Sequence, residues 1–271
     1  MTERDYESPS SLEMYEKCTL QHYFRYHEGI KIAPAVAMIR GSSGHKGQEH
    51  NYIQKIESRI DCPVDEVLDV TSDEFEDRSQ YIEDWEGLKK PAVKDGLIDL
   101  MKHVHKKHFP TVQPVKVETP FMIEMPSPDG IIKIKGVPDV IAENGPSLAI
   151  RDSKFTTKAK SQADADGSLA GTIYAYAEKI NIFTLDAMIR TKAGNNKVDS
   201  KTGTRTEDDF RRLELRIPQM IKAIKSDIVY PCSPTEWWCS KERCGFWNIC
   251  EQGAKNVGAV HFDVKPSQSI I

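Results

Sequence analysis

The 271-residue sequence has no signal-peptide pattern at its N-terminus and no apolar run long enough to span a membrane. It also has no internal repeat. The formal net charge is -4, so the chain lacks the excess of positive charge expected of a protein that coats nucleic acid indiscriminately. These absences favour a cytoplasmic protein whose six cysteines have no reason to form disulfides.

The composition is that of an ordinary globular protein, with 39% apolar and 29% charged residues. We expect a single domain over residues 1–271. Hydrophobic periodicity and turn residues predict the following elements between the motifs: helices over 73–108 (split near Lys90 and Pro91), 162–179 and 207–226 (bent at Pro218), extended chain over 111–125 and 181–191, and a mobile loop or extended turn over 192–205.

The segment from Gly136 to Phe155 sets two aspartates thirteen residues apart, with a lysine two residues beyond the second. Residues 131–142 alternate and are β-branched, residues 143–147 (ENGPS) favour a turn, and residues 148–154 resume an apolar strand, which predicts an antiparallel hairpin.

A turn about Asn144 and Gly145 would place Asp139 opposite Ile150, with Asp152 as its diagonal neighbour roughly 7 Å away on the same face. Strand alternation puts Lys154 on that face and leaves the backbone carbonyl of Ser153 near the carboxylates. Two carboxylates could then share a cation. A slip of one residue would turn Asp139 away, and an exposed hairpin face carrying solvated charge is the alternative interpretation.

Two N-terminal segments are candidate helices. The first spans Ser8 to Tyr26, with Ser10 or Ser11 as its N-cap. In the second, Gly41 to Glu49 (GSSGHKGQE), His45 and Glu49 lie one turn apart on the same helix face. Glu49 is interpreted as a solvated or helix-stabilising carboxylate.

Three cysteines gather near the C-terminus, where Cys239, Cys244 and Cys250 are separated by four and five residues. Clustered thiols in a cytosolic chain favour a metal site, and soft thiolates suit both zinc and iron-sulfur clusters. Short C-x2-C knuckles, which zinc sites usually show, do not occur.

These segments together resemble the RecB-like branch of the PD-(D/E)xK nucleases. The resemblance rests on the opening helix with its mid-helix Cys18, on the glycine, histidine and glutamate spacing of Gly41 to Glu49, and on five residues of the hairpin: Pro138, Asp139, Asp152, Ser153 and Lys154.

The resemblance implies an α/β fold with a restriction-endonuclease-like core, in which helices flank a mixed central β-sheet. Within this single domain, residues 1–60 would form N-terminal helices that carry Cys18 and His45, and residues 111–191 would form the catalytic core. Residues 206–252 would form the C-terminal helix and the cysteine cluster, and residues 253–271 a loosely held tail. His45, Asp139, Asp152 and the Ser153 carbonyl would bind Mg2+ or Mn2+, and Lys154 would serve catalysis.

The cysteines resemble those of the iron-sulfur subset of this branch, which includes CRISPR-associated and phage exonucleases. In that subset Cys18, Cys239, Cys244 and Cys250 would hold a [4Fe-4S] cluster that joins the two ends of the chain. Cys232 is the alternative fourth ligand, and Zn2+ the alternative metal. The family more often places the first two C-terminal cysteines two residues apart, so the ligand set stays open.

The implied function is a Mg2+/Mn2+-dependent DNA nuclease, with an exonuclease favoured, acting in DNA processing, recombination or repair in a prokaryotic or phage-infected cell. Expected partners are single-stranded DNA or duplex ends and recombination or CRISPR adaptation proteins. In the family a glutamine precedes Tyr174 by four residues and the pair positions the nucleic acid, whereas this chain has Ala170 there. A weak or inactive DNA-binding scaffold that keeps the metal cluster is therefore the alternative.

Overall fold

A computed structural model of the chain describes residues 5–127, 130–191 and 194–250. The chain divides into two compact units. The first comprises residues 1–12 and 33–223, and the second comprises residues 13–32 and 224–271. The expectation of one domain over 1–271 stays a prediction, and the expected tail beyond residue 252 lies outside the described residues.

The helices and strands follow one another in a mixed α/β order. The helical elements are α1 (Pro9–Lys17), α2 (Thr19–His22), a π-helix η1 (Tyr23–His27), α3 (Val36–Ser58), α4 (Val64–Ser79), α5 (Lys90–Lys107), a 3-10 helix η2 (Phe109–Thr111), α6 (Gln162–Asp166), α7 (Leu169–Glu178) and α8 (Glu207–Lys225). The strands are β1 (Pro114–Val117), β2 (Phe121–Ser127), β3 (Gly130–Gly136), β4 (Val140–Asn144), β5 (Ser147–Thr156), β6 (Ile182–Ile189) and β7 (Lys197–Thr204).

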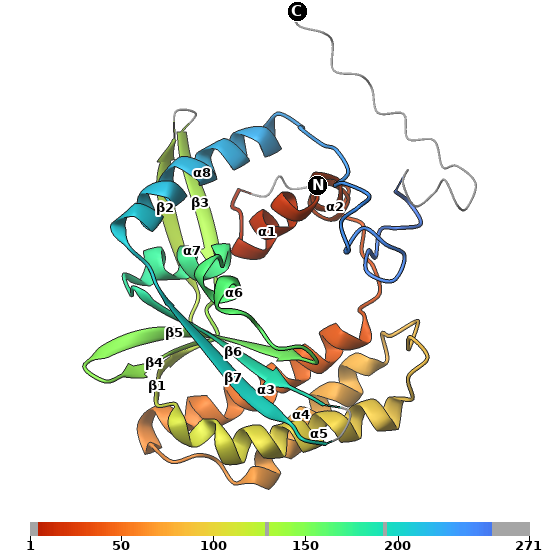
Figure 1. The fold of residues 1–271 in the computed structure, drawn as a ribbon, viewed down its shortest axis with the longest axis vertical. Helices are drawn as coiled ribbons and strands as arrows, with labels where there is room; N and C mark the ends of the chain where they lie inside the picture. The colour runs from red at the N-terminus through yellow and green to blue at the C-terminus, as the bar shows by residue number, and fades with distance from the viewer. Residues whose placement is uncertain (1–4, 128–129, 192–193, 251–271) are drawn as a thin grey trace, which may run out of the picture. The chain divides into compact units, whose positions relative to one another are not determined.

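A five-stranded mixed sheet forms the centre of the first unit, with the strand order β1-β4-β5-β6-β7. All its pairings are antiparallel except β5 with β6, which α6 and α7 connect as a crossover. Helices α3 and α5 pack on the sheet, α4 packs on both of them, and Figure 1 shows all three on one side of the strands. This arrangement confirms the expected fold class.

The main apolar core lies between this helical layer and the sheet. Phe75, Leu97, Leu100 and Met101 are fully buried there. A smaller cluster around Ile150 and Phe183 packs with α7. Strand β6 is buried along nearly its whole length, as expected of a central strand with helices on both faces.

The strand expected over residues 131–142 is in fact two strands. β3 pairs with β2 in a separate two-stranded sheet, and β4 begins only at Val140. Pro138 lies in the break between them, where its missing N–H and fixed φ prevent a continuous ladder.

The expected hairpin register was also wrong. Val140 pairs with Arg151 and Ile141 with Ile150, so the turn consists of Gly145 and Pro146 and the register differs by two residues from the prediction. A shift of two keeps every side chain on its expected face, because strands alternate with period two.

Three other predicted elements need correction. Residues 197–204, expected as a loop, form the edge strand β7, because the polar side chains of an edge strand can face solvent on both sides. The helix expected over 162–179 is interrupted at residues 167–168, where Ser168 caps α7 by accepting a hydrogen bond from the Gly171 N–H. The helix expected over 8–26 breaks at Cys18, whose backbone is extended.

Helix α4 begins at Val64, earlier than the expected start at residue 73. The helix α8 runs continuously through Pro218. Within the part of the chain that the structure describes, every helix is too short or too polar to cross a lipid bilayer.

Candidate active site

Asp139 and Asp152 meet at the end of the β4–β5 pair. Asp139 directly precedes β4, and the register that joins Val140 to Arg151 brings it beside Asp152. The backbone N–H of Ser153 donates a 2.7 Å hydrogen bond to the Asp139 carboxylate. The strand pairing itself therefore fixes the first carboxylate against the second strand.

Helix α3 brings His45 to the same place. Its Nδ1 lies 3.4 Å from the Asp139 carboxylate, and its ring packs edge-on against Phe155 of β5. The glycines beside His45 permit this close approach. A β-carbon at Gly44 would lie 2.6 Å from the Phe155 ring, and one at Gly47 would lie 2.1 Å from the Thr71 hydroxyl of α4.

A third carboxylate, which sequence reasoning missed, completes this group. Glu118 follows β1, and its backbone N–H donates a 3.0 Å hydrogen bond to the Asp139 carbonyl. Potential metal-ligand atoms of His45, Glu118 and Asp139 all lie within 4.8 Å of one another. In the sequence, Glu118 is recognisable only as an acidic residue in the break before Thr119 and Pro120. Its position beside Asp139 results from the pairing of β1 with β4, which are far apart in the sequence.

The local electrostatics suit a cation. Partial burial, together with the charges of Asp139 and Glu49, raises the pKa of Glu118 to about 7. Burial also raises the pKa of Asp139, although His45 opposes the shift. Carboxylates whose charge is disfavoured by burial and mutual repulsion gain from a bound divalent cation, which reverses both effects.

Lys154 and Asp152 form a close ion pair on β5. The Lys154 Nζ lies 2.6 Å from the Asp152 carboxylate, and 48% of the lysine side chain is exposed against 9% for the aspartate. The buried carboxylate is thus neutralised by a lysine that remains accessible from solvent.

Ser153 points to the opposite face from its neighbours, as strand alternation predicts. Its hydroxyl donates a 3.0 Å hydrogen bond to the amide oxygen of Gln48 on α3, and both side chains are buried. Sequence reasoning did not identify Gln48. Glu49 binds Lys46 at 2.8 Å, in agreement with a helix-stabilising role.

Tyr174 lies on α7 and is partly buried. Its ring contacts Phe121 of β2 edge-on, with 6.0 Å between ring centroids. Ala170 lies one turn earlier on the same helix. A role for Tyr174 in positioning nucleic acid stays a prediction.

Five cysteines line one pocket in the second unit: Cys18, Cys232, Cys239, Cys244 and Cys250. The sulfur of Cys18 accepts a 3.4 Å hydrogen bond from the Cys232 N–H, and the Gln21 amide donates to the Cys244 sulfur at 3.3 Å. Burial, then the nearby Cys18, raises the pKa of Cys232 to about 12, and burial also raises that of Cys244. Crowded thiols of this kind, of which Cys18 is buried and the others are partly exposed, fit a metal group, which stabilises the thiolate form.

One solved structure supports the fold. A candidate exonuclease from Eubacterium rectale is 13% identical, with a TM-score of 0.52, and the match covers 93% of this chain and 88% of that one. The protein SSO0001 is 13% identical over 90% and 93% of the two chains, with a TM-score of 0.38. LHK-Exo in complex with dAMP is 10% identical over 69% and 91%, with a TM-score of 0.34. No curated protein sequence matches the chain.

The family model of the PD-(D/E)XK nuclease superfamily matches residues 7–251, which is most of the chain. The matched region contains the hairpin carboxylates, His45 and the cysteines. The chain belongs to the PD-(D/E)XK nuclease superfamily.

Proposed function

We propose that the protein is a Mg2+- or Mn2+-dependent DNA nuclease of the RecB-like branch that acts as an exonuclease. The observation that carries this proposal is the convergence of His45, Glu118 and Asp139, from α3, the β1–β2 connection and the start of β4. The ion pair of Asp152 and Lys154 lies on the strand next to them.

The donor set fits a hard or borderline divalent cation. Carboxylate oxygens suit Mg2+, and the added imidazole of His45 shifts the preference toward Mn2+. Glu118, Asp139, Asp152 and His45 would hold the ion, with the Ser153 carbonyl as a further ligand. When bound, the cation would polarise a phosphoryl oxygen and supply an activated water.

The remaining roles belong to the protein itself. Lys154 would orient the attacking water or neutralise the negative charge that develops on the phosphate, and it also holds the Asp152 carboxylate. The Ser153 N–H keeps the Asp139 carboxylate fixed, so that little reorganisation is needed on metal binding.

The proposal is tested by digestion of end-labelled single-stranded and duplex DNA with Mg2+ or Mn2+. We expect Asp152→Asn and Lys154→Ala to lower the cleavage rate by roughly 10²-fold or more. Asp199 and Lys201 of β7 form a 2.9 Å ion pair with the same spacing and provide matched controls. Asp199→Asn and Lys201→Ala should cleave normally. Robust cleavage by folded Asp152→Asn or Lys154→Ala protein would disprove the assignment.

The cysteine pocket is proposed to hold a [4Fe-4S] cluster. Its lining supplies five thiols, one more than the cluster needs, and the Gln21 amide donates to one of the sulfurs, as is common around such clusters. Protein purified without oxygen should absorb near ~400 nm and contain iron and sulfide, whereas a zinc protein would be colourless.

The fourth cluster ligand can be assigned with two variants. If Cys18 is the ligand, Cys18→Ser should lose iron while Cys232→Ser keeps it, and the reverse result assigns Cys232. Both sulfurs lie at the same pocket, so the geometry alone favours neither.

A second candidate function is a DNA-binding scaffold without nuclease activity, which Ala170 favours because the family glutamine is missing there. A protein that binds DNA but does not degrade it with either metal would support this candidate. For both candidate functions we propose recombination or CRISPR adaptation proteins as partners.

A further inference from the structure

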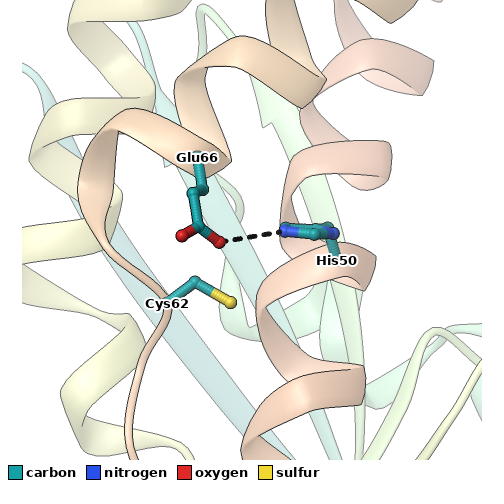
Figure 2. A group of neighbouring side chains, drawn as sticks. All are labelled: His50, Cys62 and Glu66. Atoms are coloured by element: carbon teal, nitrogen blue, oxygen red, sulfur yellow. Dashed lines mark ion pairs between the residues drawn. The ribbon is translucent and has the colours of Figure 1, made fainter.

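A second group of side chains that could hold a metal ion consists of residues other than those assigned to the nuclease site. His50 is on α3, Cys62 is in the connection to α4, and Glu66 is in the first turn of α4. Their potential ligand atoms all lie within 4.8 Å of one another. Figure 2 shows the three side chains pointing toward one another across the two helices.

We propose that His50, Cys62 and Glu66 form a zinc site that joins α3 to α4. The set combines a thiol, an imidazole and a carboxylate, and Zn2+ accepts all three. Water would take the fourth position, as it does in zinc sites with three protein ligands.

The separation of the ligand atoms fits a zinc ion. Bonds of about 2.0 to 2.3 Å place the ligand atoms of a tetrahedral site roughly 3.3 to 3.8 Å apart. The His50 Nε2 already lies 3.8 Å from a Glu66 carboxylate oxygen. These two side chains are 40% and 59% exposed, so they have room to adjust.

The thiol, in contrast, is held in place. Cys62 is buried with 4% of its surface exposed. Its backbone N–H donates a 2.8 Å hydrogen bond to the Asn51 side chain, and its carbonyl lies 2.7 Å from the His105 Nε2. Side chains from α3 and α5 therefore fix the residue from two directions, and the site has one rigid ligand and two adjustable ones.

The neighbouring contacts also point to a prepared position. Asn51 and Lys55 of α3 both donate to the Asp61 carboxylate, at 2.9 and 2.8 Å, which fixes the chain just before Cys62. The Cys62 thiol donates a 3.4 Å hydrogen bond to the Gln54 amide oxygen. A weak contact of that kind is easily replaced by a metal bond.

The test compares the zinc content of wild-type protein with that of His50→Gln, Glu66→Gln and Cys62→Ser after equilibration in a zinc-buffered solution. We expect each variant to bind one zinc ion fewer than wild type. Asp65→Asn changes the exposed carboxylate next to Glu66 and should bind as much zinc as wild type. Equal zinc content in wild type, His50→Gln and Glu66→Gln would overturn the proposal.

A second measurement keeps the test independent of the cysteine pocket and of nuclease activity. On Co2+ substitution, the spectrum of wild type minus that of Cys62→Ser should contain a thiolate-to-cobalt charge-transfer band. If Cys62→Ser does not fold, the zinc content of His50→Gln and Glu66→Gln decides, because both changes are at exposed side chains. Zinc should also raise the melting temperature of wild type more than that of His50→Gln.

Discussion

The hydroxyl of Ser153 donates a 3.0 Å hydrogen bond to the amide oxygen of Gln48, and neither side chain is accessible to solvent. This contact joins α3, which carries His45, to β5, which carries Asp152 and Lys154. It fixes the distance between the two elements on which the proposed chemistry depends.

Replacing Gln48 should therefore affect both stability and activity. We expect Gln48→Ala to destabilise the protein by about 1–3 kcal/mol, because the buried Ser153 hydroxyl loses its acceptor. Urea unfolding measures this loss, and cleavage should slow in the same variant. Gln80→Ala, at an exposed helix end, is the control. In a double-mutant cycle with Ser153→Ala the two effects should not add, and simple additivity would contradict the coupling.

Glu118 should be more important for function than for folding. Burial raises its pKa from 4.5 to about 7. Between these pH values Glu118 is protonated in the folded protein and ionised in the unfolded chain, so the metal-free protein loses stability as pH rises. Glu118→Gln should then be more stable than metal-free wild type at pH 8 and equally stable below pH 4.5. Thermal unfolding at both pH values tests this, with Glu124→Gln on β2 as the control. A variant less stable than wild type at pH 8 would contradict it.

Metal affinity should follow the same titration. The carboxylate of Glu118 must lose its proton before it can bind a cation, so Mn2+ should bind more weakly below pH 7 than above it. Calorimetric titration at about pH 6 and pH 8 measures the difference. The pH dependence should be shallower in Glu118→Gln, and an unchanged dependence would exclude Glu118 as a ligand.

Asp186 of β6 and Arg151 of β5 form a largely buried ion pair, with 1% and 16% of their side chains exposed. The guanidinium makes two hydrogen bonds of 2.8 Å to the carboxylate, and the Ser200 hydroxyl donates a third. Asp186→Asn should destabilise the protein by up to about 3–5 kcal/mol, because it leaves a partly buried arginine without its counter-charge. Asp199→Asn on β7 should change stability little, since that aspartate is partly exposed.

The effect of Asp186→Asn should depend on pH. Burial alone would raise the pKa of Asp186, but the nearby His108 imidazole and the Arg151 charge outweigh it and lower the pKa from its ordinary value of 3.8. A lowered carboxylate pKa stabilises the fold above the ordinary value, and this stabilisation is lost as pH falls through the lowered one. The difference between wild type and the variant should therefore be largest near neutral pH and should shrink in acid. A difference that stays constant into acid would contradict this linkage.

The sequence was sufficient for the fold class, which the family resemblance implied, and for the grouping of Asp139, Asp152 and Lys154, which follows from local strand patterns. Strand alternation preserved the faces of these side chains even though the register was wrong by two residues. Glu118 could not be found in the same way. Its place beside Asp139 depends on β1 pairing with β4, and no local pattern specifies that pairing.

The same limit applies to β7 and Gln48. The polar residues 197–204 form a strand only because the edge of β6 is available to them, and Gln48 is buried only because α3 packs on β5. Both features are determined by tertiary contacts, which override the local sequence propensity. The cysteines are an intermediate case, since their clustering was visible in the sequence and the inclusion of Cys232 in the pocket was one of two alternatives.

Helix α3 is closely packed around His45 against two other elements, through Gly44 against Phe155 of β5 and through Gly47 against Thr71 of α4. Such close packing restricts rotation and sliding of the helix, so the backbone that carries His45 has little freedom to move. Any change in metal preference would then have to come from replacing ligands rather than from moving the helix. Gly44 and Gly47 therefore serve to let α3 pack closely on β5 and α4. In related chains without these glycines, we expect the histidine to be present but displaced from the first carboxylate.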